Sequence, residues 1–422
     1  MWKWLMKMFR KLLTLDEAKQ VIQRRFKPRP LGVEEISLLD AYNRVLAEDV
    51  KATLNIPPFH RSIVDGYAVK AEDTFGAEEN KPVKLEICGK VNIGELPKIT
   101  LTKGTAAEIV TGAPMPEGAD AVVMVEHTIR KDDEVYIYKD VVKDENVMKV
   151  GADIKRNETI LKEGRLLRSR EIGVLAALGL AKVKVYKIPR VAILSTGPEI
   201  LKPGEELSPG KIYDINSYSL SAAVLESGGK PVYIGVFPDE VAKLQKALTH
   251  ALSSADMVLT SGGVSVGPKD VMPQTLNSLG KPGVIVCGIA IKPGKPTTFA
   301  LIGEKPVFSL PGQPTSALLT FYLLVRPIIQ RLAGRKAEKS LRTTAFAATR
   351  MFPARGRRTF IMVQLNRGKS NRLIAEPVPT GLSGAITTLA KADGFVELSE
   401  NQQFIDINEK VTVHLFKSLE GD

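Results

Sequence analysis

Over its second half, the chain alternates between short apolar runs and longer segments with helical periodicity. The apolar runs are continuous and rich in β-branched residues, which is typical of strands buried on both faces. Alternation of this kind predicts a parallel or mixed sheet covered by helices on both sides. The predicted strands are Val191–Leu194, Val232–Val236, Met257–Leu259, Val284–Ile291 and Val307–Leu310, and the predicted helices are Tyr218–Glu226, Asp239–Leu252, Val271–Leu279 and Thr315–Ala333.

The first half of the chain has a different pattern, in which helical segments flank a region of short strands. Thr14-Leu-Asp-Glu17 has the composition of a capping box, and the helix behind it should end before Pro28. A second helix is predicted from Ser37 to about Glu48, and a third within residues 165–179. Between them, Gly and Pro separate β-branched runs, which predicts an inserted β domain. Its predicted strands are Val83–Ile87, Ala107–Val110, Ala121–Val125 and Val135–Tyr138.

The residues after Arg335 show strand-like runs with turn signals and no obvious helix, which predicts a β barrel or sandwich of roughly 80 residues. The predicted fold class is therefore multidomain, α/β plus β, around a central αβα domain. The predicted domains are a discontinuous helical hinge domain (14–53 and 150–187), an inserted β domain (54–149), the α/β domain (188–335) and a C-terminal β barrel (338–418).

Charge and cysteine content narrow the functional classes. The 422 residues carry a formal net charge of +12, yet no Lys/Arg block with interleaved aromatic residues is present. The charge therefore favours anionic small molecules over nucleic acid. Two cysteines without a CxxC motif fit a reducing cytoplasm. No segment reaches the ~20 apolar residues of a membrane span, and the basic segment Met1–Leu13 is expected to be an extension rather than a signal peptide.

Polar, glycine-rich turns lie at the ends of the predicted strands of the α/β domain. Ligands bind at the carboxyl ends of strands in such sheets, so five turns of this kind predict a site there. The glycines and hydroxyls of 260–270 suit phosphate, and Asp270 suits Mg²⁺ or a polar ligand group. Lys292 and Lys295 share a proline-stiffened turn that would hold two ammonium groups for an anion, although solvated loop lysines are the alternative. The turns span 195–199, 213–217, 260–270, 292–296 and 311–316.

Further candidate stretches lie outside the α/β domain. Residues 57–69 place Asp65 and a glycine between apolar residues, and residues 111–123 are rich in Pro and Gly. In the last domain, Arg357 and Ser383 could offer a guanidinium and a hydroxyl to an oxyanion. Each stretch alone is more typical of a turn or a surface loop than of a site.

Taken together and in order, these motifs are highly specific. DGYAV, TGAPxPxGADAVV, STGxE, YDxN, TSGGVSVGxxD, KPGKP and LPGxPxSA occur over about residues 14 to 415. The set resembles the MoeA family, the molybdopterin molybdenumtransferases, which include the E domains of gephyrin and of its plant counterpart. The resemblance implies the four-domain architecture predicted above. It also implies an elongated homodimer, with a cleft between the α/β domain of one subunit and the inserted domain of the other.

The reaction that the resemblance implies is metal insertion in molybdenum cofactor biosynthesis. Adenylylated molybdopterin and molybdate (or tungstate) bind, AMP is released with the help of Mg²⁺, and the metal enters the dithiolene. The dithiolene supplies the soft ligands, so no protein cysteine is needed. The implied partners are the adenylyltransferase that makes the substrate and acceptor molybdo- or tungsto-enzymes. The alternative function is a non-catalytic molybdopterin carrier or scaffold, which the paired lysines and four carboxylates disfavour.

Site residues follow from the resemblance by motif match. The implied catalytic acids are Asp65, Glu199, Asp214 and Asp270, of which Asp65, from the partner subunit, and Asp270 would position Mg²⁺ or water. The implied oxyanion-binding residues are Lys292, Lys295, Ser316, Arg357 and Ser383. The implied substrate-binding residues are Thr111, Ser195, Thr196, Gly197, Asn216, Ser261, Gly262, Gly263, Pro311, Gly312 and Pro314. The chain departs from the family pattern at His60, Ala152, Ser217 and Gln313, which leaves metal preference and efficiency open.

Overall fold

The computed structural model describes residues 12–263, 271–336, 341–368, 371–378 and 387–416. It divides into two compact units. One comprises Met1–Glu35, Asn43–Ala47 and Lys184–Asp422, and the other comprises Ile36–Tyr42 and Glu48–Val183. The chain passes between the units at four points, and two of these lie in hydrogen-bonded strands, β1 (Val33–Ser37) and β12 (Lys182–Tyr186).

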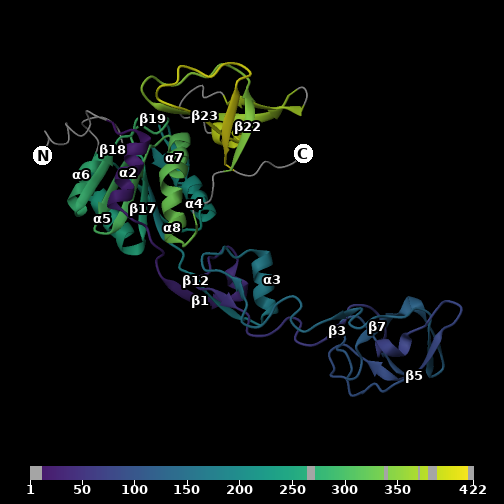
Figure 1. Cartoon of the computed structure of the whole chain (residues 1–422). Helices are drawn as coiled ribbons and strands as arrows, with labels where there is room; N and C mark the ends of the chain where they lie inside the picture. Colours follow the sequence, from purple (N-terminus) through teal and green to yellow (C-terminus); the bar gives the residue numbers. More distant parts are fainter. Residues whose placement is uncertain (1–11, 264–270, 337–340, 369–370, 379–386, 417–422) are drawn as a thin grey trace. The chain divides into compact units, whose positions relative to one another are not determined.

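A six-stranded mixed sheet forms the centre of the first unit (Figure 1). Four strands run parallel, and the last two are antiparallel to their neighbours, so the predicted sheet is confirmed. In spatial order the strands are β16 (Lys230–Phe237), β13 (Arg190–Thr196), β17 (Met257–Ser261), β21 (Lys305–Leu310), β20 (Thr298–Ile302) and β18 (Pro282–Cys287).

Successive residues of the central strands face opposite sides of this sheet and are buried on both. Val191 and Ile193 belong to one apolar core, whereas Ala192 and Leu194 belong to the other. Helices cover both faces, as the apolar runs predict (Figure 1). The first core is closed by α2 (Leu15–Arg25), α4 (Asn216–Glu226), α7 (Pro314–Thr320), the π-helical η4 (Phe321–Val325) and α8 (Arg326–Leu332), and the second by α5 (Val241–Ser254) and α6 (Val271–Leu279).

Two predictions in this domain need correction. The strand predicted over Val284–Ile291 is interrupted at Gly288, whose φ of +81° is unfavourable for other residues. Beyond the break, β19 (Ile291–Lys292) leaves the central sheet and pairs in parallel with a strand of the C-terminal domain. The long helix predicted over 315–333 is present, but its middle turn is η4, a π-helical segment.

The C-terminal domain is a closed five-stranded barrel, as predicted. The strand order β23–β24–β22–β26–β25 closes because β23 also pairs with β25. The inner residues, among them Ala345, Val363 and Val413, form one buried cluster. A short helix, α9 (Thr387–Lys391), was not predicted. The strands are β22 (Arg342–Ala347), β23 (Arg358–Arg367), β24 (Leu373–Pro377), β25 (Gly394–Leu398) and β26 (Lys410–Leu415).

The second unit contains the inserted β domain, whose six-stranded sheet has the order β7–β4–β6–β5–β9–β8.

The helix predicted from Ser37 to Glu48 is wrong: only a 3₁₀ turn forms at Leu38–Ala41, and Asn43 adopts a φ of +63° that ends it. The predicted helix within 165–179 is α3 (Ser169–Ala177). The strands are β2 (Val50–Lys51), β3 (Arg61–Ser62), β4 (Gly66–Val69), β5 (Val83–Val91), β6 (Thr105–Ile109), β7 (Ala121–Met124), β8 (Thr128–Lys131), β9 (Glu134–Ile137), β10 (Val147–Met148) and β11 (Thr159–Leu161), with 3₁₀ turns at Ala71–Thr74 and Val125–His127.

Candidate functional site

A cavity of about 1380 Å³ lies at the carboxyl ends of the parallel strands, where such sheets bind ligands. All of its lining residues belong to the first unit. The structure therefore gathers at one place most of the residues that the sequence singles out. The predicted residues that line it are Ser195, Thr196, Gly197, Glu199, Asp214, Asn216, Ser261, Gly262, Gly263, Lys292, Lys295, Pro311, Gly312, Pro314, Ser316 and Arg357.

A buried polar cluster forms the floor of the cavity beside β13. Ser195 Oγ donates a hydrogen bond to Asp214 Oδ1 (2.8 Å), and the Ser217 N–H donates to the same oxygen (3.0 Å). Ser217 Oγ lies 2.8 Å from Ser195 Oγ. Because Asp214 lies just before the start of α4, its carboxylate also faces the positive end of that helix, which is a favourable position for a negative charge.

A second set of hydrogen bonds ties two strand ends to the start of α4. Asn216 Nδ2 donates to Ser261 Oγ and to the Gly312 carbonyl, both at 2.7 Å. Ser261 Oγ in turn donates to the carbonyl of Pro311 (3.1 Å). These bonds hold the turns after β17 and β21 against the start of α4.

Three buried oxygens in this region have no hydrogen-bond partner among the described residues. They are Thr196 Oγ1, Asp214 Oδ2 and Asn216 Oδ1, and their residues are at most 8% exposed. A buried polar atom without a partner costs about 1–3 kcal/mol, so it is normally satisfied by water or a ligand. The three oxygens thus present unused acceptor sites, and one potential hydroxyl donor, to whatever occupies the cavity.

The turn after β17 depends on glycine. Gly262 has a φ of +93°, and a Cβ there would lie 2.1 Å from the Thr196 carbonyl oxygen. Gly263 has a φ of +64°, with Thr196 Oγ1 only 2.7 Å from the corresponding position. Because Gly262 and Gly263 have no side chains, this turn can pack against the end of β13.

The basic residues come from the junction between the α/β domain and the barrel. In the β19–β23 pairing, Lys292 lies opposite Thr359, and Arg357 directly precedes β23. Ser316 lies in the first turn of α7, where its hydroxyl is 3.4 Å from Gln313 Oε1. Lys292, Lys295 and Arg357 thus line the cavity together with the Ser316 hydroxyl. Cationic groups and a hydroxyl are the donors that an oxyanion requires.

Four predicted residues are not among those that line the cavity. Asp65 and Thr111 belong to the second unit, where the Thr111 N–H and hydroxyl donate to Asp65 Oδ1 at 2.6 and 2.9 Å. These two hydrogen bonds hold the pKa of Asp65 below its usual value of 3.8, and the one from the backbone N–H has the larger effect. Asp270 and Ser383 lie outside the described residues.

The departures from the family pattern have distinct surroundings. Ser217 is fully buried against Ser195, whereas Gln313 is exposed at the cavity. His60 and Ala152 are exposed in the second unit. Gln313 therefore lies in the cavity lining, whereas Ser217 supports it from the buried polar cluster beside Ser195.

Sequence reasoning missed several residues of the cavity. Asp239 adds a carboxylate just after β16, and Lys211 adds a cation whose Nζ donates to the Pro198 carbonyl. Asp239 could have been predicted from the sequence, because it follows a predicted strand of the same sheet. The sequence gives no such indication for the apolar side chains of Ile200, Leu207 and Ile212, because two of them are brought together by the pairing of β14 (Ile200–Leu201) with β15 (Ile212–Tyr213).

The described part of the chain contains neither a clustered set of metal ligands nor a membrane-spanning helix. No group of three or more His, Cys, Asp or Glu side chains is arranged to bind a metal ion. In that same part, each helix is too short or too polar to cross a bilayer.

Comparisons with known proteins agree with this geometry over nearly the whole chain. Three family models match: the MoeA N-terminal region (domains I and II) at residues 13–179, a probable molybdopterin-binding domain at 192–331, and the MoeA C-terminal region (domain IV) at 344–416. Fold and site therefore define a multidomain α/β protein of the molybdopterin-binding class.

Individual relatives narrow the class. A putative molybdopterin biosynthesis protein of Methanocaldococcus jannaschii is 35% identical, with 98% of this chain and all of the relative covered. The molybdopterin molybdenumtransferase of Haemophilus influenzae is 34% identical over 97% of this chain and all of its own length. The crystal structure of a molybdopterin biosynthesis MoeA protein from Pyrococcus horikoshii superposes with a TM-score of 0.83 at 42% identity, covering 97% of this chain and all of that chain. The chain belongs to the MoeA family, the molybdopterin molybdenumtransferases, and is a transferase of molybdenum cofactor biosynthesis.

Proposed function

We propose that this enzyme inserts molybdenum into adenylylated molybdopterin, using molybdate (or tungstate) as the second substrate and releasing AMP with the help of Mg²⁺. The observation that carries this proposal is the composition of the cavity. A cationic end formed by Lys292, Lys295 and Arg357 and a buried polar floor around Asp214 line one continuous space. Such a space suits a large substrate that must meet a small dianion.

The cationic end is the proposed oxyanion site. Charge-assisted hydrogen bonds from lysine and arginine to an oxyanion are roughly twice as strong as neutral ones. Lys292 and Lys295 flank Pro293 and Gly294, so the turn holds their backbones at a fixed separation. Ser316 offers a hydroxyl from the start of α7, and Ser383 is proposed as a further contact.

The polar floor is the proposed site for the pterin and its nucleotide. A pterin ring carries several N–H groups, which Asp214 Oδ2 and Asn216 Oδ1 are free to accept within the described structure. Gly262 and Gly263 line the cavity, and without side chains their backbone is proposed to approach a phosphate closely. Glu199, exposed at the rim, is proposed to orient the substrate.

The oxygen donors of the cavity fit Mg²⁺, which prefers hard oxygen ligands and keeps several waters. Asp239 adds a carboxylate to the cavity lining, apart from the floor oxygens assigned above to the pterin. Mg²⁺ bound there would neutralise negative charge on the pyrophosphate. Asp270 and Asp65 are proposed to hold the ion or position water.

We further propose that Asp65 and Thr111 come from a second subunit of a homodimer. Thr111 lowers the pKa of Asp65 by hydrogen bonding to Oδ1, which leaves Oδ2 to face a ligand. A cytoplasmic adenylyltransferase is expected to supply the substrate, and acceptor molybdo- or tungsto-enzymes would receive the product.

The test is to incubate the purified protein with adenylylated molybdopterin, Mg²⁺ and either molybdate or tungstate. AMP release that depends on the oxyanion is the expected result, and the relative rates rank the two metals. Asp214→Ala should abolish release, while Lys246→Ala, an exposed change on helix α5, should not. Pterin binding without AMP release under any of these conditions would instead identify a non-catalytic carrier.

A further inference from the structure

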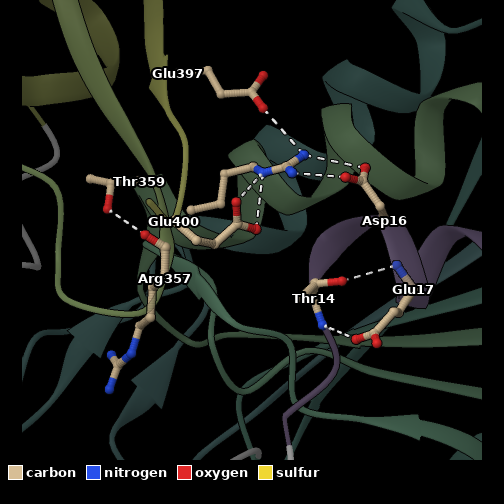
Figure 2. A network of polar contacts seen from close by, with 8 residues as sticks. Thr14, Asp16, Glu17, Arg357, Thr359, Glu397 and Glu400 are labelled. Carbon is tan, nitrogen blue, oxygen red and sulfur yellow. Dashed lines mark hydrogen bonds and ion pairs between the residues drawn. The ribbon is translucent and has the colours of Figure 1, made fainter. Parts of the chain in front are cut away.

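Arg358, next in sequence to the cavity residue Arg357, is the centre of a cluster of ionised side chains (Figure 2). Its Nη1 and Nη2 donate to the two carboxylate oxygens of Asp16, at 3.2 and 2.7 Å. Its Nε lies 3.3 Å from Glu400 Oε2, and its Nη1 lies 3.4 Å from Glu397 Oε1. We call Asp16, Arg358, Glu397 and Glu400 the Arg358 cluster; they are not part of the cavity lining described above.

The Arg358 cluster joins helix α2 to the barrel. Asp16 lies in the first turn of α2, whereas Arg358 begins β23 and Glu397 belongs to β25. The helix itself is fixed, because Leu15 and Ile22 are buried in the core of the α/β domain. Arg358 is therefore tied to a part of the molecule that cannot shift independently of the main sheet.

Backbone hydrogen bonds extend this connection toward the cavity. The Ala290 N–H donates to the carbonyl of Leu13 (2.8 Å), and the Arg358 N–H donates to the carbonyl of Ala290 (3.0 Å). Two residues beyond Ala290 is Lys292, which pairs with Thr359. The segments that carry Asp16, Lys292 and Arg358 thus lie side by side in one ladder.

Arg357 is held on the other side of the same strand end. Its N–H donates to the Ala354 carbonyl (3.0 Å), and its carbonyl accepts from Thr359 Oγ1 (3.1 Å). Figure 2 shows the Arg357 side chain pointing away from Asp16, Glu397 and Glu400. Because successive residues of a strand point to opposite sides, anchoring Arg358 in the cluster sets the direction of Arg357.

The pairing is electrostatically stable near neutral pH. Hydrogen bonding to Arg358 holds the pKa of Asp16 below its usual value of 3.8. Burial lowers the pKa of Arg358, but the hydrogen bond with Asp16 and the nearby carboxylates give a net rise. Both groups therefore stay charged over the whole range around neutral pH.

We propose that Asp16 and Arg358 are positioning residues, which hold Arg357 in the geometry that binds the oxyanion and thereby make helix α2 a support for that site. The inference rests on the proposed function, since it assigns Arg357 to molybdate. A bidentate Arg–carboxylate pair has defined geometry, which a lysine or an amide in either position cannot reproduce.

The test measures molybdate binding by calorimetric titration of the full-length chain. Asp16→Asn and Arg358→Lys should each weaken binding roughly five- to tenfold, as expected when a charged ligand contact is misplaced but not removed. In an Arg357→Ala background, Asp16→Asn should weaken binding further by less than about twofold, because it acts through the missing residue. Arg350→Gln, which breaks an exposed pair with Asp406 (2.9 Å) in the same barrel, serves as the control and should leave affinity unchanged.

The outcomes separate this inference from the proposed function. A wild-type chain that binds neither molybdate nor tungstate overturns the proposed function and the inference with it. A wild-type chain that binds, with Asp16→Asn unaffected, overturns the inference alone. A loss of affinity that is equally large in the Arg357→Ala background would also overturn it, because it would show a general structural effect. Thermal unfolding of each variant confirms that it is folded during the titration.

Discussion

Lys292 and Arg357 are expected to act through charge, since Lys292 is exposed and Arg357 only half-buried. Replacing Lys292 with Ala should weaken molybdate binding roughly 10- to 100-fold, because a hydrogen bond to a charged group contributes about 1.5–3 kcal/mol. Titration of the purified variant with molybdate measures the change. Lys243→Ala, which removes an exposed partner of Glu240 on α5, is the matched control. Equal affinity in the two variants would contradict the assignment of Lys292.

Asp65 gives a residue-scale prediction about pH. Its folded-state pKa is lowered, so its ionisation favours the folded state above the unfolded-state pKa near 3.8, and this contribution is lost as the pH falls through the lower, folded-state value. Thr111→Val removes the hydroxyl donor but keeps the N–H, so the pKa of Asp65 should rise part of the way toward 3.8. NMR titration of the Asp65 carboxyl carbon measures the shift. An unchanged pKa would mean that the hydroxyl does not bind Asp65 in solution.

At the scale of elements, the turn after β17 can be tested with two glycines that line the same cavity. Gly262→Ala should lower the free energy of unfolding by about 1–3 kcal/mol, since a positive φ is strained for alanine and the new Cβ meets the Thr196 carbonyl at 2.1 Å. Gly312→Ala should cost far less, because its nearest neighbour would be 3.6 Å away and its φ is not in the left-handed region. Thermal melts of the two variants compare them directly. Similar losses would show that the chain adopts a different turn after β17 in solution.

The elements that the sequence predicts well are those whose burial pattern is local. Strands such as β13 and β17 coincide with continuous apolar runs, so the sequence alone predicts them. The end of the strand at Gly288 could not be predicted in this way. Ile291 is as apolar as Val286, although the two residues belong to different sheets. Periodicity reports which side chains are buried, whereas the choice between two sheets depends on partners far along the chain. The helix expected at 37–48 failed for a related reason: Leu46 forms a bridge with Val185 of β12 instead of continuing a helical stripe.

For the molecule as a whole, the sequence alone could not assign Asp65 to the cavity; only the family resemblance does so. Asp65 and Lys292 belong to different compact units, and nothing in local pattern says which units meet. The residues of the cavity in the first unit were predictable because they follow strands of a single sheet, whose ends share one edge. Whether Asp65 of one subunit reaches the cavity of another depends on how subunits assemble, and this can be tested by mixing subunits.

If the active site is shared between the subunits of a homodimer, two variants that each impair the site should complement each other. In a mixed dimer of Asp65→Ala and Lys292→Ala chains, one site receives both substitutions and the other receives neither. Purified mixed dimers should therefore recover about half of the wild-type activity, since the two sites of a two-fold dimer are equivalent. AMP release after coexpression of differently tagged chains, purified in two affinity steps, measures the recovery. A site built within one subunit would always contain one of the two substitutions. Mixed dimers that are no more active than either variant alone would therefore exclude the shared site.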